Sequence, residues 1–281
     1  MTRVFARWTA VLGLGFLVLA PSVARAQSDD PAALKLAEPD FTLIALPTSL
    51  RLPRFGSAFR VTHRFTRSLT EGSFGDVAQD LFGIDAGAVI GLEYRFGIIR
   101  NGQIGIHRTG NRTIEFFGQY DLIRQGARAP FEISALVTID GTNNFRDSYS
   151  PALGAIVSRT FHDTAALYVE PIWVNNTNPL PRELVDHNDT FMIGLGARIR
   201  VRPTVYVVGE ITPRAAGNRP GVNQGGFALE KRAGGHTFQV NFSNAFGTTM
   251  AQIARGGPRR LEGGDIKRDW YLGFNISRKF F

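Results

Sequence analysis

Charged side chains recur at every second position in many short segments whose other positions are apolar. If these segments are strands, the charges share one face, because successive side chains of a strand point to opposite sides. Such a lining could select ions or small acids in a pore. It could instead close a narrow lumen through salt bridges, since buried charges are costly unless they pair. The candidate lumen-facing residues are Arg60, Arg64, Glu93, Arg95, His107, Glu115, Asp121, Glu132, Asp140, Glu170, Arg198, Arg200 and Glu210.

Metal and thiolate chemistry find little support. The chain has no cysteine, which excludes a disulfide framework and a thiolate metal site. No two of the five histidines have a spacing typical of metal ligands, such as i, i+4 on a helix. His63 falls on the apolar face beside Phe65, and we expect it near a membrane rim. No metal and no cofactor is therefore predicted.

An outer-membrane lipid hydrolase is the enzymatic alternative. It would need a serine, a histidine and an orienting polar residue that converge on one surface. Ser243, Asn244 and His236 lie in one segment, but Ser243 and Asn244 point to opposite faces of a strand and His236 is seven residues away from Ser243. No catalytic motif is present, so the chain is predicted not to be an enzyme.

The elements that would position these charges are about twelve strands with a period of two. Each is about as long as the 9–11 residues that a tilted strand needs to cross a bilayer. We expect strands near residues 55–65, 87–96, 103–107, 113–122, 131–140, 148–161, 165–175, 191–201, 205–211, 227–230, 237–246 and 270–280.

The alternation alone does not say whether the apolar face points into the protein or into lipid. The connections do favour a membrane barrel, because those after even-numbered strands are short and those after odd-numbered strands are long, with residues 110–112 as the exception. Periplasmic turns and extracellular loops produce this parity. Helical spacing predicts a short helix at Phe74–Leu81 and, more weakly, at Thr248–Ala254, both packed over the barrel mouth.

The first residues read as a secretory signal. Arg3 and Arg7 precede a short apolar run, and Ala24-Arg25-Ala26 is an A-x-A cleavage pattern, so residues 1–26 are expected to be removed. Four prolines interrupt residues 27–54, which form a lead-in or a plug segment ahead of a barrel at 55–281.

The charge balance argues against nucleic acid as a partner. Removal of the signal lowers the net charge from +8 to about +5, and no dense basic stripe with interleaved aromatic residues is present. The basic residues near Pro258–Glu262 and at Lys267–Arg268 suit a loop that meets lipopolysaccharide phosphates. The expected partners are outer-membrane lipid, lipopolysaccharide and, during biogenesis, the barrel-assembly machinery.

Several segments together resemble a family of bacterial outer-membrane β-barrels known only as a domain of unknown function. They include Thr62–Phe65, Phe74–Asp85, Ser148–Leu153, Gly234–Asn244 and Trp270–Arg278. The last strand, which is followed by Phe281, resembles the closing strand of such barrels, although Arg278 stands on its apolar face. The resemblance implies a closed antiparallel barrel in the outer membrane and brings no assigned site residues.

The sequence therefore predicts an all-β transmembrane barrel with short helices in its extracellular loops. A narrow channel or transport accessory is the favoured function, and a structural or interaction barrel with a salt-bridged closed lumen is the alternative. Solute, oligomeric state and protein partners stay open.

Overall fold

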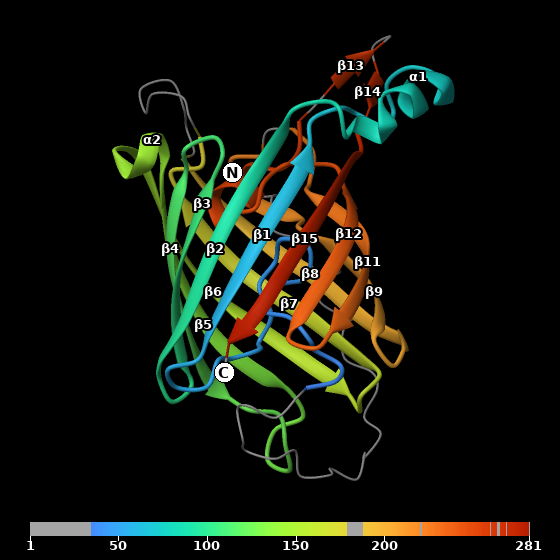
Figure 1. The fold of residues 1–281 in the computed structure, drawn as a ribbon. Helices are drawn as coiled ribbons and strands as arrows, with labels where there is room; N and C mark the ends of the chain where they lie inside the picture. Colours follow the sequence, from blue (N-terminus) through green and yellow to red (C-terminus); the bar gives the residue numbers. More distant parts are fainter. Residues whose placement is uncertain are drawn as a thin grey trace, which may run out of the picture.

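The structure is a computed structural model that describes residues 35–178, 188–219, 221–258, 260–262, 265–267 and 269–280. The predicted signal at 1–26, the start of the lead-in at 27–34, Arg268 and Phe281 lie outside the described residues. Figure 1 shows one tilted barrel of strands, with residues of the N-terminal segment inside it.

Twelve strands form the ring, as predicted. Neighbours in sequence pair in antiparallel fashion, β8 also pairs with β9, and β15 closes the ring by pairing with β1. The ring strands are β1 (Ser57–Phe65), β2 (Ala88–Ile99), β3 (Gly102–Thr109), β4 (Ile114–Ile123), β5 (Glu132–Gly141), β6 (Asp147–Phe161), β7 (Ala165–Asn175), β8 (Asp189–Arg202), β9 (Val205–Ile211), β11 (Gly225–Ala233), β12 (His236–Ser243) and β15 (Tyr271–Phe280).

Three short strands were not predicted, and two of them form the hairpin of residues 260–262 and 265–267 described below. β10 (Arg214–Gly217) follows β9 after Pro213 and pairs with the start of β8. Conversely, the strand predicted at 237–246 ends at Ser243, and Phe246 packs its ring 4.3 Å from that of Tyr271.

The apolar face of the ring points outward. Leu92, Leu153, Leu195 and Leu229 are exposed large apolar side chains, while their alternating neighbours are buried and often charged. A soluble barrel places its apolar side chains inside, so this arrangement is that of a barrel solvated by lipid. The closed ring also pairs the backbone groups that lipid cannot satisfy.

The two ends of the barrel differ. Short turns join β2 to β3, β6 to β7, β8 to β9 and β11 to β12, and this end is called the short-turn end below. The other, the long-loop end, carries α1 (Phe74–Gln79), η1 (Leu81–Gly83), α2 (Thr142–Phe145) and the hairpin of β13 (Arg260–Glu262) and β14 (Asp265–Lys267) (Figure 1). The predicted helix near Phe74 is thus confirmed, with Ser73 and Asp76 forming a capping box at its start.

Two residues that stood out on the apolar face lie against aromatic rings. His63 stacks on Phe274 with ring centroids 4.8 Å apart. The Arg278 guanidinium lies 5.0 Å from the centre of the Phe280 ring in the last strand, at the short-turn end. Among the described residues, no helix is both long and apolar enough to pass through a membrane.

The outward face generates a stability prediction. Leu153 is 59% exposed in the middle of β6, and Leu122 is 60% exposed near the short-turn end of β4. We expect Leu153→Arg to lower the free energy of unfolding in liposomes by about 2–4 kcal/mol, because arginine at mid-bilayer must leave water. Leu122→Arg should cost roughly 0–1 kcal/mol. Equal losses in urea titrations of the two variants would contradict the lipid-facing assignment.

Candidate functional site

The lumen of the barrel is occupied by its own N-terminal segment. Residues 36–52, called the lumen plug below, run through the ring as a folded segment without a helix or a strand of its own. Phe41, Leu43, Ile44 and Leu46 are among its fully or almost fully buried side chains. Its tip is a tight turn in which the Leu43 amide donates to the Leu46 carbonyl at 2.8 Å. Six of the predicted lumen charges contact this segment: Arg60, Arg64, Arg95, Asp121, Arg198 and Glu210.

Glu210 of β9 holds the tip through three consecutive amides. The backbone N–H groups of Ile44, Ala45 and Leu46 donate to its carboxylate at 2.9, 3.0 and 3.1 Å. Hydrogen bonds to an ionised group are about twice as strong as those between neutral groups. Glu210 is therefore the main anchor of the plug tip.

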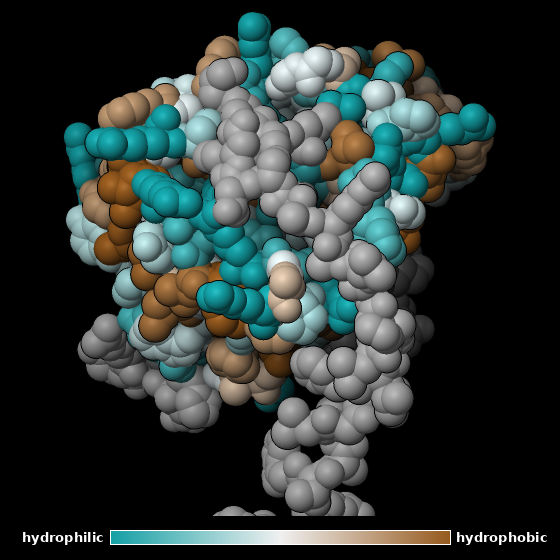
Figure 2. All heavy atoms as spheres, turned by 90° about the horizontal axis from the view of Figure 1, so that it is seen from below, coloured by the Kyte–Doolittle hydropathy of each residue, from teal (hydrophilic) through white to brown (hydrophobic). Residues whose placement is uncertain are grey.

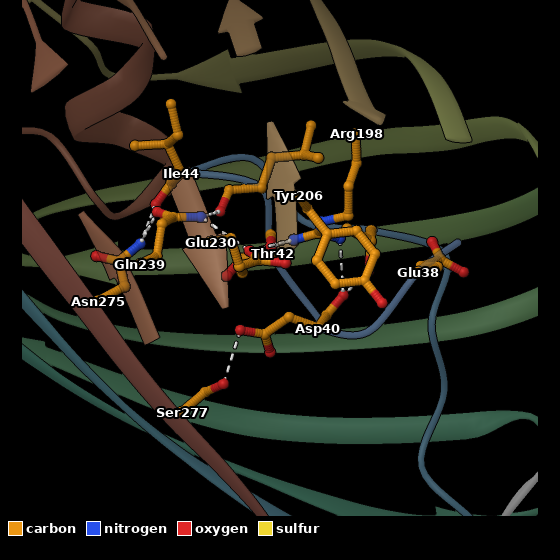
Figure 3. A network of polar contacts seen from close by, with 12 residues as sticks. Glu38, Asp40, Thr42, Ile44, Arg198, Tyr206, Glu230, Gln239, Asn275 and Ser277 are labelled. Atoms are coloured by element: carbon orange, nitrogen blue, oxygen red, sulfur yellow. Dashed lines mark hydrogen bonds and ion pairs between the residues drawn. The ribbon is translucent and has the colours of Figure 1, made fainter. Parts of the chain in front are cut away.

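Carbonyl groups of the plug face donors from the opposite parts of the wall (Figure 3). Arg198 donates to the Thr42 carbonyl at 2.6 Å, and Gln239 donates to that of Leu43 at 2.8 Å. The Ile44 carbonyl accepts from Asn275 at 2.9 Å and from Arg64 at 3.2 Å. Both sides of the turn's backbone are thus satisfied by wall side chains.

The rest of the plug is held in the same way. Gln119 donates to the Thr48 carbonyl at 3.0 Å. Gln103 bridges two groups, since it donates to the Leu50 carbonyl and accepts from the Leu52 amide, each at 3.1 Å.

Side chains of the plug also contact the wall. Tyr168 donates to Glu38 at 2.8 Å. Ser277 donates to Asp40 at 2.7 Å, as Figure 3 shows. Lys35, just before the plug, forms ion pairs with Glu38 and with Glu132 at 2.9 Å. Burial opposes its charge, but these two carboxylates more than offset that effect and raise the pKa of Lys35.

Lumen-facing glycines make room for the aliphatic side chains at the tip. A Cβ at Gly196 would lie 2.1 Å from Leu43 Cδ1, and a Cβ at Gly194 would lie 3.0 Å from Leu46 Cδ1. A Cβ at Gly226 would lie 3.2 Å from Ile44 Cδ1. Because real Cβ atoms essentially never approach other heavy atoms within 3.0 Å, a larger residue at Gly196 would displace Leu43 or the plug.

A second insert enters from the long-loop end. The short helix α3 (Met250–Arg255) buries Met250, Ala251, Ile253 and Ala254 inside the mouth of the barrel. Glu115 accepts a hydrogen bond from the Met250 amide at 2.8 Å, and Asp140 accepts one from Thr249 at 2.5 Å. The weak helix prediction at Thr248–Ala254 is confirmed, and it packs within the mouth.

The predicted charges pair with one another only in part. Glu93 binds both Arg60 and Arg95 at 2.5 Å, and Arg198 binds Glu230 of β11 at 3.0 Å. His107 lies 3.9 Å from Glu115, and Asp121 lies 3.7 Å from Arg51 of the plug. Arg200 lies at the short-turn end, where it donates to the Pro203 carbonyl, and it is not fully buried. Glu170 is completely buried, yet neither of its oxygens has a hydrogen-bond partner among the described residues.

The charge pattern missed the neutral wall residues that hold the plug. Gln103, Gln119, Gln239 and Asn275 carry no charge and so did not stand out as candidates. They nevertheless lie on the same face of their strands as the charged residues. Their position on this polar face would have identified them as candidates. Glu230, which pairs with Arg198, was likewise on that face and was overlooked.

The hydrolase candidates do not converge. His236 begins β12 and Ser243 ends it, which separates them by about 23 Å at the usual rise of a strand. Ser243 donates to the Gly225 carbonyl, while Asn244 accepts from the Gly225 amide. In the described residues no cluster of three or more acidic or histidine side chains is placed to hold a metal ion.

Comparison with known proteins identifies the family. A family described as a membrane-bound beta barrel domain (DUF5777) matches residues 42–280, which include the plug tip. The chain belongs to this family. It is an outer-membrane β-barrel, as the outward apolar face and the closed ring require. No curated protein matches the chain.

Distant likenesses to solved structures accompany this family match. The KdgM porin is 8% identical, with 80% of this chain and 99% of that chain covered and a TM-score of 0.49. The COG4313 outer membrane channel from Pseudomonas putida F1 is 10% identical, with coverages of 82% and 97% and a TM-score of 0.46. A triple-mutant porin of Rhodopseudomonas blastica is 12% identical, with coverages of 68% and 55% and a TM-score of 0.36.

The anchoring role of Glu210 can be tested by hydrogen exchange. Glu210→Gln keeps the shape of the side chain but removes its charge, so the amides of Ile44, Ala45 and Leu46 should exchange at least tenfold faster. Glu115→Gln is the matched control, since Glu115 binds the Met250 amide and no plug atom. It should speed exchange at Met250 and leave the plug tip unchanged. Identical exchange patterns in the two variants would show that Glu210 does not anchor the plug.

Proposed function

We propose that this protein is a narrow, non-enzymatic outer-membrane channel whose lumen plug closes it and must shift for solute to pass. The observation that carries the proposal is the way the plug is held. Wall side chains bind it through hydrogen bonds that Glu210 accepts and that Arg198, Arg64 and neutral side-chain amides donate, without a covalent link. Water can replace each of these bonds when the segment leaves.

The side chains that line the wall favour the hypothesis of a movable plug rather than that of a permanently closed barrel. A lumen that never opens gains stability from apolar packing or from ion pairs within the wall, because unpaired buried charge is costly. Here Glu210 accepts its hydrogen bonds from plug amides, Arg64 donates to the plug as well as to Asn275 of the wall, and Glu170 has no partner among the described residues. A hydrated pore would solvate all three groups.

The two inserts meet in one buried apolar cluster, to which both the plug tip and α3 contribute aliphatic side chains such as Leu43, Leu46 and Ile253. A small cavity lies between the plug and the segment that leads into α3, and Thr42, Arg60, Arg95, Thr138 and Met250 are among the residues that line it. Arg60 Nε, Arg95 Nη1 and Thr138 Oγ1 have no hydrogen-bond partner among the described residues. A polar gap beside this shared cluster is consistent with a path that opens when the plug and α3 move together.

A reversible cross-link tests whether plug movement opens the channel. The double variant Leu43→Cys with Gly196→Cys places two thiols next to each other. A Cβ at position 196 would lie 3.6 Å from Leu43 Cγ, and a cysteine at position 43 would carry its sulfur near the place of that Cγ, within the reach of a disulfide. The chain has no other cysteine. In planar bilayers we expect the oxidised double variant to be silent and the same sample to conduct after reduction.

Each single cysteine variant serves as a control, because it should conduct with or without oxidant. Equal conductance of the double variant before and after reduction would mean that the plug is not the gate. Silence of the wild-type and reduced proteins at all voltages would reject a channel and favour the structural barrel.

A further inference from the structure

The wall of the lumen recognises polypeptide backbone. Its polar side chains bind carbonyl groups at Leu36, Thr42, Leu43, Ile44, Thr48 and Leu50 and amides at Ile44, Ala45, Leu46 and Leu52. Plug side chains contribute fewer contacts. From this pattern we infer that the channel proposed above takes oligopeptides as its substrate class, and that the plug occupies the substrate's place.

Backbone recognition makes such a site tolerant of sequence. Every peptide offers the same amide and carbonyl groups, so hydrogen bonds to the main chain give affinity while side-chain pockets give preference. Arg198, Gln239 and Asn275 come from β8, β12 and β15 and converge on the turn at Thr42–Ile44 (Figure 3). Arg64 of β1 also donates to the Ile44 carbonyl. Their donors stay on the wall when the plug leaves and remain available to another chain.

Glu210 distinguishes a peptide from other small solutes. Three successive N–H donors converge on this one carboxylate, a pattern that a folded peptide backbone supplies. A sugar or a small organic acid has no such row of amides, and an anionic group at this position would meet repulsion from the Glu210 carboxylate.

The side-chain pockets predict which peptides fit best. Gly194, Gly196 and Gly226 leave space on β8 and β11 that Leu46, Leu43 and Ile44 fill. Aliphatic residues at these positions should therefore be preferred. Glu170 lies beside Gly194, because a Cβ added at position 194 would be 3.2 Å from the Glu170 Cβ. Leu46 fills the space at Gly194, so a lysine in place of Leu46 would find the Glu170 carboxyl group without a partner.

Current block by the plug's own sequence tests the inference. The probe is an acetylated and amidated decapeptide with the sequence of Asp40–Ser49, added to full-length Leu43→Ala in planar bilayers. Leu43→Ala weakens the seating of the native plug at Gly196, and the free peptide still carries that leucine. We expect concentration-dependent block of the open current at micromolar to millimolar peptide.

A matched peptide separates backbone recognition from simple occlusion. It carries N-methyl groups at the residues equivalent to Ile44, Ala45 and Leu46, which removes the three donors to Glu210 and keeps every side chain. Its blocking concentration should be at least tenfold higher. In a channel that also carries Glu210→Gln, the two peptides should differ less in blocking concentration. A third peptide, with lysine in place of Leu46, should block at a lower concentration when the channel has Glu170 than when it carries Glu170→Gln.

The results also separate this inference from the proposed channel. Absence of any current without peptide would overturn the channel itself. A current that the decapeptide does not block, or that a neutral oligosaccharide of equal size blocks as well, would overturn the peptide assignment and leave the channel standing. Equal block by the methylated and unmethylated peptides would do the same.

Discussion

Closure of the strand ring is the constraint on which the rest of this structure depends. In lipid every backbone N–H and C=O must pair within the protein, so the pairing of β15 with β1 is what makes the other strands tenable in a bilayer. Once the ring is closed, its alternating pattern has only one arrangement compatible with lipid, with leucines such as Leu153 and Leu195 outward and charges such as Arg64 and Glu93 inward. The unusual chemistry of the interior follows from that outward face.

A polar interior then creates a problem that the plug solves. Charged groups brought inside a narrow ring need partners, and the wall supplies only some of them through Arg60, Glu93 and Arg95 and through Arg198 with Glu230. The lumen plug provides further hydrogen bonds through its backbone, a set of donors and acceptors that does not depend on side-chain identity. The hydrogen bonds between wall side chains and plug backbone therefore stabilise the closed state, and the same wall groups would give the affinity for a peptide.

The plug and α3 have different relations to the wall. The plug is bound along its length by side chains from many strands, whereas α3 is held at its two ends. Glu115 and Asp140 bind its start, and Arg214 donates to the Arg255 carbonyl at its end. The wall glycines match the plug tip closely, with Gly196 facing Leu43 and Gly194 facing Leu46. Such matching explains why the small residues stand on a face that otherwise carries large polar side chains.

The sequence alone determined the number of strands, the parity of the loops and the face on which Arg60, Arg64, Glu170 and Glu210 lie, because a strand's period of two is a local property of the backbone. The alternation alone did not say whether that face looked into lipid or into the lumen, but the loop parity favoured the lumen, and the structure confirms this. Gln103, Gln239 and Asn275 carry no charge and were undervalued. Only the tertiary structure showed that a plug fills the lumen and that these side chains bind it. The partners of Glu210 are amides 164 to 166 residues away in the chain, and contacts over such separations exist only once the ring has closed around the plug.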